Sequence, residues 1–130
     1  MTQKIAVQPL STNHAPAAIG PYSQGVVVGD LVFVSGQLPL DPETGDFVAG
    51  DIGKKAHQCL KNIAAIAAAA GTSLDRAVKL TVFLTDMADF AAVNEVYSQY
   101  FKTTLPARSA LQVAALPKNA TIEIEAILAR

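Results

Sequence analysis

Apolar positions recur along this chain with two different periods, and these periods predict its strands and helices. The apolar runs 26–28 and 31–34 flank Gly29-Asp30, which predicts a β-hairpin with a two-residue turn. A half-exposed strand alternates apolar and polar residues, whereas these runs are apolar at nearly every position. We therefore expect both faces of this sheet to be covered.

A helical period follows a loop at 37–50 that is rich in proline and glycine. The apolar residues that recur at intervals of three or four are Ile52, Ala56, Cys59, Ile63 and Ala67. Asp51 stands where an N-cap is expected, and Gly71 stands where a left-handed residue commonly ends a helix. The pattern predicts a helix between these two residues.

The second half of the chain predicts a strand, a helix and two further strands. The expected elements are a strand over 78–84, a helix over 89–102, and strands over 108–114 and 121–128 separated by a turn at 117–119. In the first of these strands, Val78 is expected on the same face as Leu80, Val82 and Leu84. A short extra strand is expected at 4–7.

The element order, ββαβαββ apart from the extra strand, predicts one α+β domain over residues 1–130 with both helices on one face of the sheet. Two helices shield only one face, yet the strands carry apolar side chains on both. The favoured explanation is a homo-oligomer whose sheets pack on one another. Cover by loops is the alternative, but these loops are short and polar.

Composition narrows the classes of partner. The chain has 130 residues, 51% of them hydrophobic and 16% charged, with a net charge of -1. A near-neutral chain without a basic stripe argues against nucleic acids and anionic membranes as partners. Cys59 is the one cysteine, and we see neither a secretory signal nor an apolar run long enough to span a membrane. We expect a cytoplasmic protein.

Several kinds of site are disfavoured. His14 and His57, the two histidines, belong to no ligand-spaced cluster, so no metal site is expected. We interpret His57 as a surface residue and Cys59 as a buried apolar side chain rather than a nucleophile. The stretch 50–55 contains glycines and lysines but lacks the spacing of a phosphate loop, and the start of a helix explains it.

Charged residues in the last third of the chain carry the strongest chemical signal. Arg108 begins an otherwise apolar strand, where an arginine is costly unless it is paired. Glu123 and Glu125 share one face of the next strand. Two interpretations remain open: a cross-strand ion pair between Arg108 and Glu123, or a site where Arg108 binds a substrate carboxylate and Glu123 orients or deprotonates water.

Other candidate site residues have equally ordinary explanations. Tyr22, in the segment GPYSQG at 20–25, could pack in a turn, and Ser35-Gly36 could simply end a strand. A glycine at a strand end also allows a ligand to approach the backbone closely. Asn94 interrupts the apolar pattern of the second helix and could be a solvated position.

Five segments together resemble the RidA (YjgF) family of enamine and imine deaminases. They are AAIGPYSQ at 17–24, FVSGQ at 33–37, VNEVY at 93–97, PARS at 106–109 and IEIEA at 122–126. The most specific part is the PARS segment, followed at the family's spacing by Leu116-Pro117 and then by IEI. The resemblance covers nearly the whole chain.

This resemblance implies a chorismate-mutase-like α+β fold assembled as a homotrimer, with the sheets forming a central barrel and three sites between subunits. It implies hydrolysis of short 2-imino acids, formed from 2-aminoacrylate or 2-aminocrotonate, to 2-keto acids and ammonia. Neither a metal nor a cofactor is implied. A small 2-imino or 2-keto acid is the ligand to be expected.

The resemblance also implies roles for individual residues. Arg108 matches the family's carboxylate-binding arginine, and Glu123 matches its acidic residue near the water. The matched pocket positions are Tyr22, Ser35, Gly36 and Asn94. Ala110 stands where many relatives have a cysteine, which removes any thiol role there but keeps a backbone N–H for the substrate carboxylate.

Three other functions compete with this one. A non-catalytic trimer of the same fold that binds 2-keto acids or other small carboxylates would share Arg108. An RNA-cleaving translation inhibitor, an activity attributed to relatives, conflicts with the near-neutral charge and the lack of paired histidines. A purely structural oligomer would leave Arg108 and Glu123 unexplained except as a salt bridge.

Overall fold

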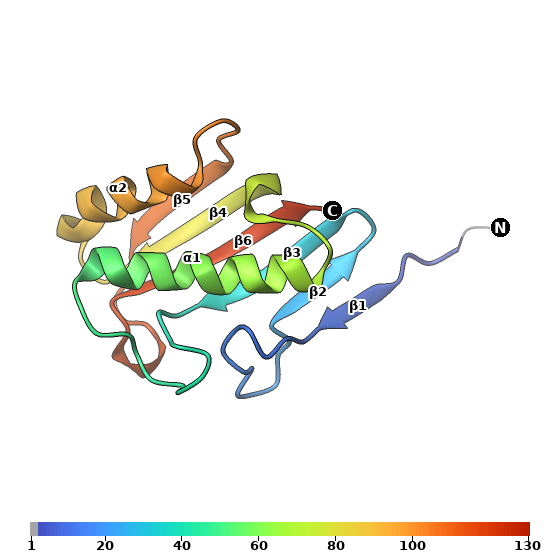
Figure 1. Ribbon diagram of the computed structural model, residues 1–130, viewed down its shortest axis with the longest axis horizontal. Coiled ribbons are helices and arrows are strands. Elements are labelled where there is room, and N and C mark those ends of the chain that lie inside the picture. The colour runs from blue at the N-terminus through green and yellow to red at the C-terminus, as the bar shows by residue number, and fades with distance from the viewer. Residues whose placement is uncertain (1–2) are drawn as a thin grey trace.

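The protein is built on a mixed sheet of six strands (Figure 1). The computed structural model describes residues 3–130. The strands are β1 (Val7–Leu10), β2 (Gly25–Val28), β3 (Leu31–Gln37), β4 (Ala77–Leu84), β5 (Ala107–Gln112) and β6 (Ile122–Ala129). Their order across the sheet is β1-β2-β3-β6-β4-β5. Only β4 and β5 pair in parallel. The last strand of the chain therefore lies inside the sheet, between β3 and β4.

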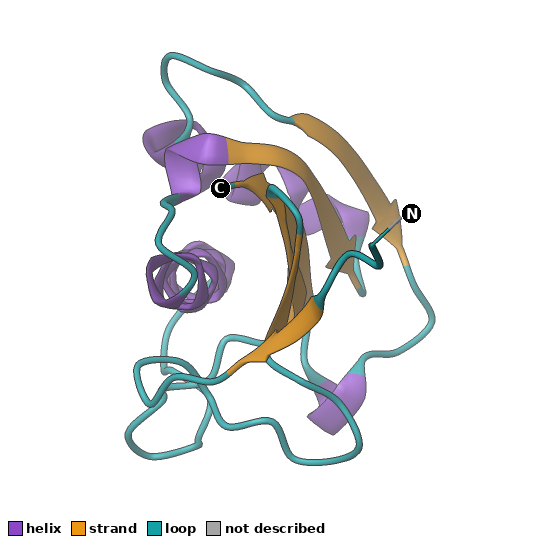
Figure 2. Ribbon diagram, turned by 90° about the vertical axis from the view of Figure 1, so that its right-hand side faces the viewer, coloured by secondary structure: helices purple, strands orange, loops and turns teal. Residues whose placement is uncertain are grey.

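Both helices cover the same face of the sheet, which Figure 2 shows nearly edge-on. The longer helix, α1 (Ile52–Ala69), packs across β3 and β6, and α2 (Phe90–Tyr100) lies beside α1 over the β4 and β5 edge (Figure 1). This arrangement confirms the predicted α+β architecture with two helices on one face.

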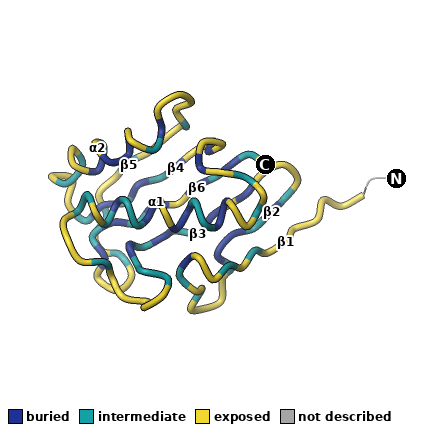
Figure 3. Tube along the Cα trace, viewed as in Figure 1, coloured by how far each residue is buried: buried dark blue, intermediate teal, exposed yellow. Residues whose placement is uncertain are grey.

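Burial alternates along the central strands, so one face of the sheet forms the core with the helices. In β6, Ile122 and Ile124 are fully buried, whereas Glu123 between them faces the other side. Figure 3 shows the central strands as the most buried part of the chain. Apolar side chains also occur on the helix-free face, and Phe33 there is 41% exposed. We expected both faces of the sheet to be covered, but within residues 3–130 only the face beneath the helices is covered.

Local signals placed the ends of α1 and the hairpin correctly. The Asp51 side chain accepts a hydrogen bond from the backbone N–H of Lys54 at 3.0 Å, as an N-cap should. Gly71, just beyond the helix, has a φ of +79°, the left-handed conformation that favours glycine. Gly29 likewise has a φ of +57° in the hairpin turn between β2 and β3.

Strand boundaries differ from the prediction in three places. The N-terminal strand lies at Val7–Leu10 rather than 4–7, because Pro9 is acceptable on an edge strand that needs no N–H there. A bulge between Ala77 and Lys79 leaves Val78 46% exposed and buries Ala77 instead, so the predicted face for Val78 was wrong. The strand predicted to reach residue 114 ends at Gln112.

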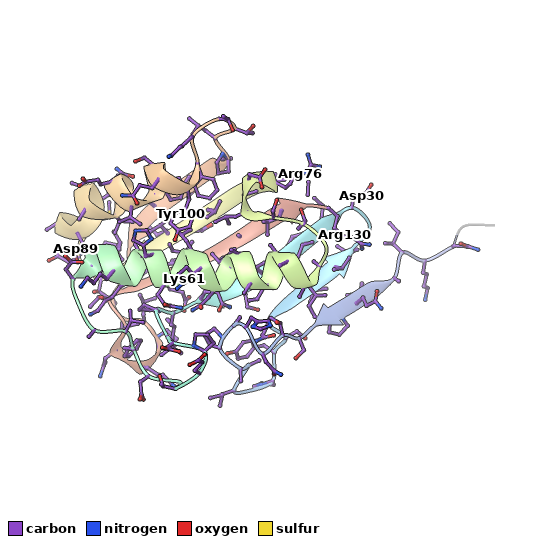
Figure 4. All side chains as sticks on the ribbon, viewed as in Figure 1. Asp30, Lys61, Arg76, Asp89, Tyr100 and Arg130 are labelled. Atoms are coloured by element: carbon purple, nitrogen blue, oxygen red, sulfur yellow. The ribbon has the colours of Figure 1, made fainter. Side chains whose placement is uncertain are left out.

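The C-terminus is fixed against the hairpin. The backbone N–H of Arg130 donates to the carbonyl of Asp30 at 2.8 Å, and Figure 4 shows these two residues side by side.

Neither helix in the described part of the chain combines the length and apolar character that crossing a membrane requires.

Candidate functional site

The guanidinium of Arg108 lies at the sheet edge, on the side of the helices. Arg108 pairs with the buried Leu80, so its side chain leaves β5 toward α2. There its Nη1 donates to Asn94 Oδ1 at 2.6 Å, and its Cζ lies 5.1 Å from the Phe90 ring centroid and 4.7 Å from that of Tyr97. Arg108 still counts among the exposed residues. We call Arg108 with these three α2 residues the arginine shelf.

Glu123 lies on the opposite, helix-free face. Glu123, in β6, pairs with Phe83 of β4. A bulge in β3 places Ser35 and Gly36 against the single residue Glu125. A Cβ built on Gly36 would lie 2.6 Å from Glu123 Oε1. Glycine is needed here because the protein's own carboxylate occupies the space beside it.

A pocket of about 620 Å³ opens over this carboxylate. Its polar lining comes from Tyr22, Gln24, Ser35, Gln37, Lys118, Glu123 and Glu125. Most of the remaining wall is apolar, supplied by the loops before β2, after β3 and before β6. A concave, largely apolar site with a few converging polar groups suits a small ligand. We call it the glutamate pocket.

The environment of Glu123 favours its protonated form. Partial burial, and secondly the nearby Glu125 carboxylate, raise the pKa of Glu123 above its ordinary value. A raised pKa brings a carboxyl group closer to the pH at which it can both accept and return a proton, which is the requirement for a general acid–base. A perturbed titratable group in a pocket is also a recognised mark of a functional site.

The cross-strand ion pair between Arg108 and Glu123 was a wrong expectation. The two residues belong to strands that are consecutive in sequence, but β4 lies between β5 and β6. Their side chains also leave opposite faces of the sheet, since Arg108 aligns with Leu80 and Glu123 with Phe83. Within one chain, the two groups belong to separate half-sites.

The remaining predicted site residues divide between these half-sites. Tyr22, Ser35 and Gly36 line the glutamate pocket with Glu123. Asn94 belongs to the arginine shelf. Ala110 lies two residues after Arg108 on the same face of β5, where it pairs with Val82 and packs partly buried against the core.

A buried glutamine that was not predicted shapes one wall of the glutamate pocket. Gln24 is 5% exposed, and its Nε2 donates to the carbonyls of Thr12, Ala15 and Pro16 at 3.0, 3.3 and 2.8 Å. Its Oε1 accepts from the Thr12 N–H at 2.7 Å. This side chain therefore fixes the loop that carries Tyr22. The sequence feature that could have revealed this role is a glutamine placed immediately before an apolar strand.

Asn62 plays the same part on the other side of the pocket. It is 1% exposed within α1, and its Nδ2 donates to the carbonyls of Leu38 and Leu40 at 3.2 and 3.0 Å. An amide inside the apolar stripe of a helix was the signal. Phe90 and Tyr97 are apolar positions of α2, and periodicity alone does not reveal that Arg108 rests on their rings.

The two side chains not assigned to a site, His57 and Cys59, both have structural contacts. His57 is partly buried rather than a plain surface residue, because its Nδ1 lies 2.8 Å from Tyr100 Oη, a hydrogen bond that joins the two helices. Cys59 is fully buried, and burial raises the pKa of its thiol, as expected for an apolar core position. No three His, Cys, Asp or Glu side chains gather into a metal site within residues 3–130.

Comparisons with known proteins show the family to which the chain belongs. A family model described as Endoribonuclease L-PSP matches residues 12–130. The chain is 57% identical over 122 residues to RutC family protein y4sK of Sinorhizobium fredii, covering 94% of this chain and 97% of that one. It is 52% identical over 118 residues to a human protein named 2-iminobutanoate/2-iminopropanoate deaminase, covering 91% of this chain and 86% of that one.

A solved structure extends the similarity to the fold. A crystal structure of E. coli TdcF with bound serine matches with a TM-score of 0.90 and 49% identity, covering 95% of this chain and 98% of that one. The family match spans both half-sites, from the loop that carries Tyr22 to the end of β6. The chain therefore belongs to the RidA (YjgF) family, whose family model carries the endoribonuclease L-PSP description.

Proposed function

We propose that this chain is a hydrolase acting on C=N bonds, which converts small 2-imino acids to 2-keto acids and ammonia. The observation that carries the proposal is the pair of half-sites: an accessible guanidinium on a shelf, and a carboxyl group with a raised pKa in a small pocket. The name of the human relative supports 2-iminobutanoate and 2-iminopropanoate as substrates. These form from 2-aminocrotonate and 2-aminoacrylate.

We also propose that the working unit is a homotrimer of single-domain chains with sheets packed into a central barrel. The helix-free face supports this assembly because it carries partly exposed apolar side chains, such as Phe33, beside the glutamate pocket. The opposite placement of Arg108 and Glu123 supports it more strongly. A complete site then combines the arginine shelf of one subunit with the glutamate pocket of its neighbour.

In this site Arg108 binds the substrate carboxylate through a two-pronged pair of hydrogen bonds, and Asn94 holds the guanidinium in place. The backbone N–H of Ala110 is a second donor to that carboxylate. The pocket residues Tyr22, Ser35 and Gly36 enclose the imine against Glu123. TdcF with bound serine supports a small ligand bearing a carboxylate in this family.

The chemistry requires one water and one proton carrier. Water adds to the electrophilic carbon of the protonated imine, a C–O bond forms, and the C=N π pair moves to nitrogen, while Glu123 takes a proton from the water. The resulting carbinolamine then loses ammonia. Glu123 returns its proton to nitrogen, and the C–N bond breaks as the hydroxyl oxygen forms the new carbonyl. The hydroxyl proton passes to the Glu123 carboxylate and from there to the departing ammonia, which leaves as ammonium. Positioned acid–base help of this kind contributes about 10²–10⁴-fold.

Mixing two inactive variants tests both the residues and the assembly. Arg108→Ala and Glu123→Gln should each abolish imine hydrolysis in a coupled assay with a serine or threonine dehydratase, while leaving the oligomer intact. When equal amounts are unfolded and refolded together, about a quarter of the intersubunit sites regain both residues, so about a quarter of wild-type activity should return. Each variant refolded alone is the matched control.

Each other outcome contradicts a named part of the proposal. Full activity of Arg108→Ala would refute the carboxylate clamp. Two inactive variants that stay inactive after mixing would place Arg108 and Glu123 in sites within one chain. A wild-type protein that binds 2-keto acids but does not accelerate imine hydrolysis would be the non-catalytic binder instead. RNA cleavage with a steep salt dependence would support the activity in the family model's description, against which the net charge of -1 argues.

A further inference from the structure

Three side chains of α2 converge on Arg108 from one stripe of the helix. Phe90, Asn94 and Tyr97 stand four and then three residues apart, the spacing that aligns side chains on one face. All three contact the same guanidinium, two by their rings and one by its amide oxygen. This stripe of α2 therefore contacts the Arg108 guanidinium as well as the sheet beneath the helix.

The contacts leave one edge of the guanidinium available. Asn94 accepts from Nη1, and no other side-chain hydrogen bond of Arg108 occurs within residues 3–130. The guanidinium has five N–H donors in a rigid fork, and Nε with Nη2 forms the edge that meets a carboxylate side-on. With Nη1 tied to Asn94 and two rings within 5.1 Å of Cζ, the free edge has a defined direction.

Tyr97 is the more revealing of the two aromatic residues. It is 8% exposed, and its buried Oη has no hydrogen-bond partner in the described part of the chain. Burying an unpartnered hydroxyl is unfavourable, so the hydroxyl does not explain the residue's contact with Arg108. The ring does, since the face of an aromatic ring attracts a cation within about 6 Å of its centroid. A phenylalanine at this position would keep that interaction.

We propose that Tyr97, together with Phe90, is a positioning residue: its ring holds the Arg108 guanidinium so that the free edge faces the substrate carboxylate. The proposal rests on the function proposed above, and it deepens that function by naming what aims the clamp. An arginine on an exposed edge strand otherwise samples many rotamers, and fixing it before the ligand arrives reduces the entropy lost on binding.

Ligand binding by matched variants tests this role. In Tyr97→Leu the ring is lost, and we expect the Kd for 2-oxobutanoate and the KM for the imine to rise about 3- to 30-fold, the range of a cation–π contact. The kcat should change far less, because the reacting atoms are not touched. The Kd for the neutral 2-oxobutanamide should stay constant, since Arg108 does not bind it as an anion. Tyr97→Phe should retain the affinity of the natural chain for 2-oxobutanoate.

Phe101→Leu is the control for packing. Phe101 is 4% exposed and contacts the Tyr97 ring with centroids 4.6 Å apart, but it makes no ring contact with Arg108. It should lower the melting temperature without altering the affinity for 2-oxobutanoate. An equal loss of affinity in Phe101→Leu and Tyr97→Leu, or no loss in Tyr97→Leu, would overturn the proposal.

A substitute variant and a comparison with Arg108→Ala complete the test of the positioning role. If Tyr97→Leu does not fold, Phe90→Leu takes its place, because Phe90 is only partly buried and its ring also faces Arg108; unchanged affinity there would overturn the proposal. The proposed function fails separately, when Arg108→Ala remains active. An inactive Arg108→Ala combined with an unaffected Tyr97→Leu would refute the positioning role alone.

Discussion

The arginine shelf and the glutamate pocket are built in opposite ways. The shelf combines one exposed edge strand with one stripe of α2, so neighbouring turns of a single helix supply the side-chain hydrogen bond and both ring contacts of Arg108. The pocket combines a bulge in β3, a central strand and loops from three parts of the chain. The shelf is local and open, whereas the pocket is assembled from distant segments and partly buried.

This difference underlies the proposal that a complete site needs two subunits, because a cation on one side of the sheet cannot act with a carboxylate on the other side of the same sheet. Three substitutions test the two halves separately. The first two, on the helix-free face and beside Glu123, are measured by activity, and the third, at Glu123, is measured by stability and has the smallest expected effect.

The largest effect should come from placing a charge on the helix-free face. In Phe33→Asp, a carboxylate replaces a ring that is 41% exposed, and burial of an unpaired charge between subunits is strongly unfavourable. We expect a folded monomer, seen by size-exclusion chromatography with light scattering, whose activity falls about 100-fold or more. Ile5→Asp, at a side chain 69% exposed and outside the sheet, is the control. A fully active Phe33→Asp trimer would show that this face is not the interface.

A smaller and more selective effect is expected from Gly36→Ala, which disturbs the glutamate pocket alone. The new Cβ would lie 2.6 Å from Glu123 Oε1. We therefore expect the flexible Glu123 side chain to move away, while the backbone of β3 and β6 keeps its position. The kcat should fall about 10²-fold, the lower end of acid–base contributions. The melting temperature and the oligomer should change little. A normal kcat would mean that the position of Glu123 beside Gly36 does not matter for catalysis.

The smallest effect concerns stability and pH. Because the pKa of Glu123 is raised, the folded state binds more protons than the unfolded state between the ordinary pKa and the raised one, so stability falls as pH rises through that window. Glu123→Gln removes this loss. Its melting temperature should match the natural chain's below pH about 4 and exceed it at neutral pH.

The control for the pH experiment is Glu43→Gln, at an exposed carboxyl in the loop 37–50. Thermal unfolding of all three proteins from pH 4 to 8 provides the measurement. If the melting temperatures of Glu123→Gln and the natural chain differ by the same amount at every pH, the ionisation of Glu123 does not affect stability, and its pKa is not raised.

Features set by neighbouring residues were predictable from the sequence. The Asp51 cap, the Gly29 turn and the buried stripe of α1 depend on contacts within a few positions, and each appeared where expected. Period two also placed Glu123 correctly, on the face opposite Ile122. In each case the sequence pattern and the structural feature that it predicts involve residues only a few positions apart.

The relation between the half-sites could not be predicted in this way. Periodicity tells which face of a strand a residue occupies, but strand order depends on contacts between distant segments. Arg108 and Glu123 lie on strands that follow one another in sequence, and the insertion of β6 between β3 and β4 leaves no local trace. The same holds for Gly36, beside which the Glu123 carboxylate lies, and for the carbonyls that Gln24 binds.

The hydrogen bonds of Gln24 have a kinetic consequence. One side chain holds the loop at Thr12, Ala15 and Pro16 simultaneously, so the loop does not fray residue by residue. We therefore expect it to open as one cooperative unit, in the manner of local unfolding, when the Gln24 side chain is released. The rate at which the wall carrying Tyr22 opens should then be the rate of that unit as a whole.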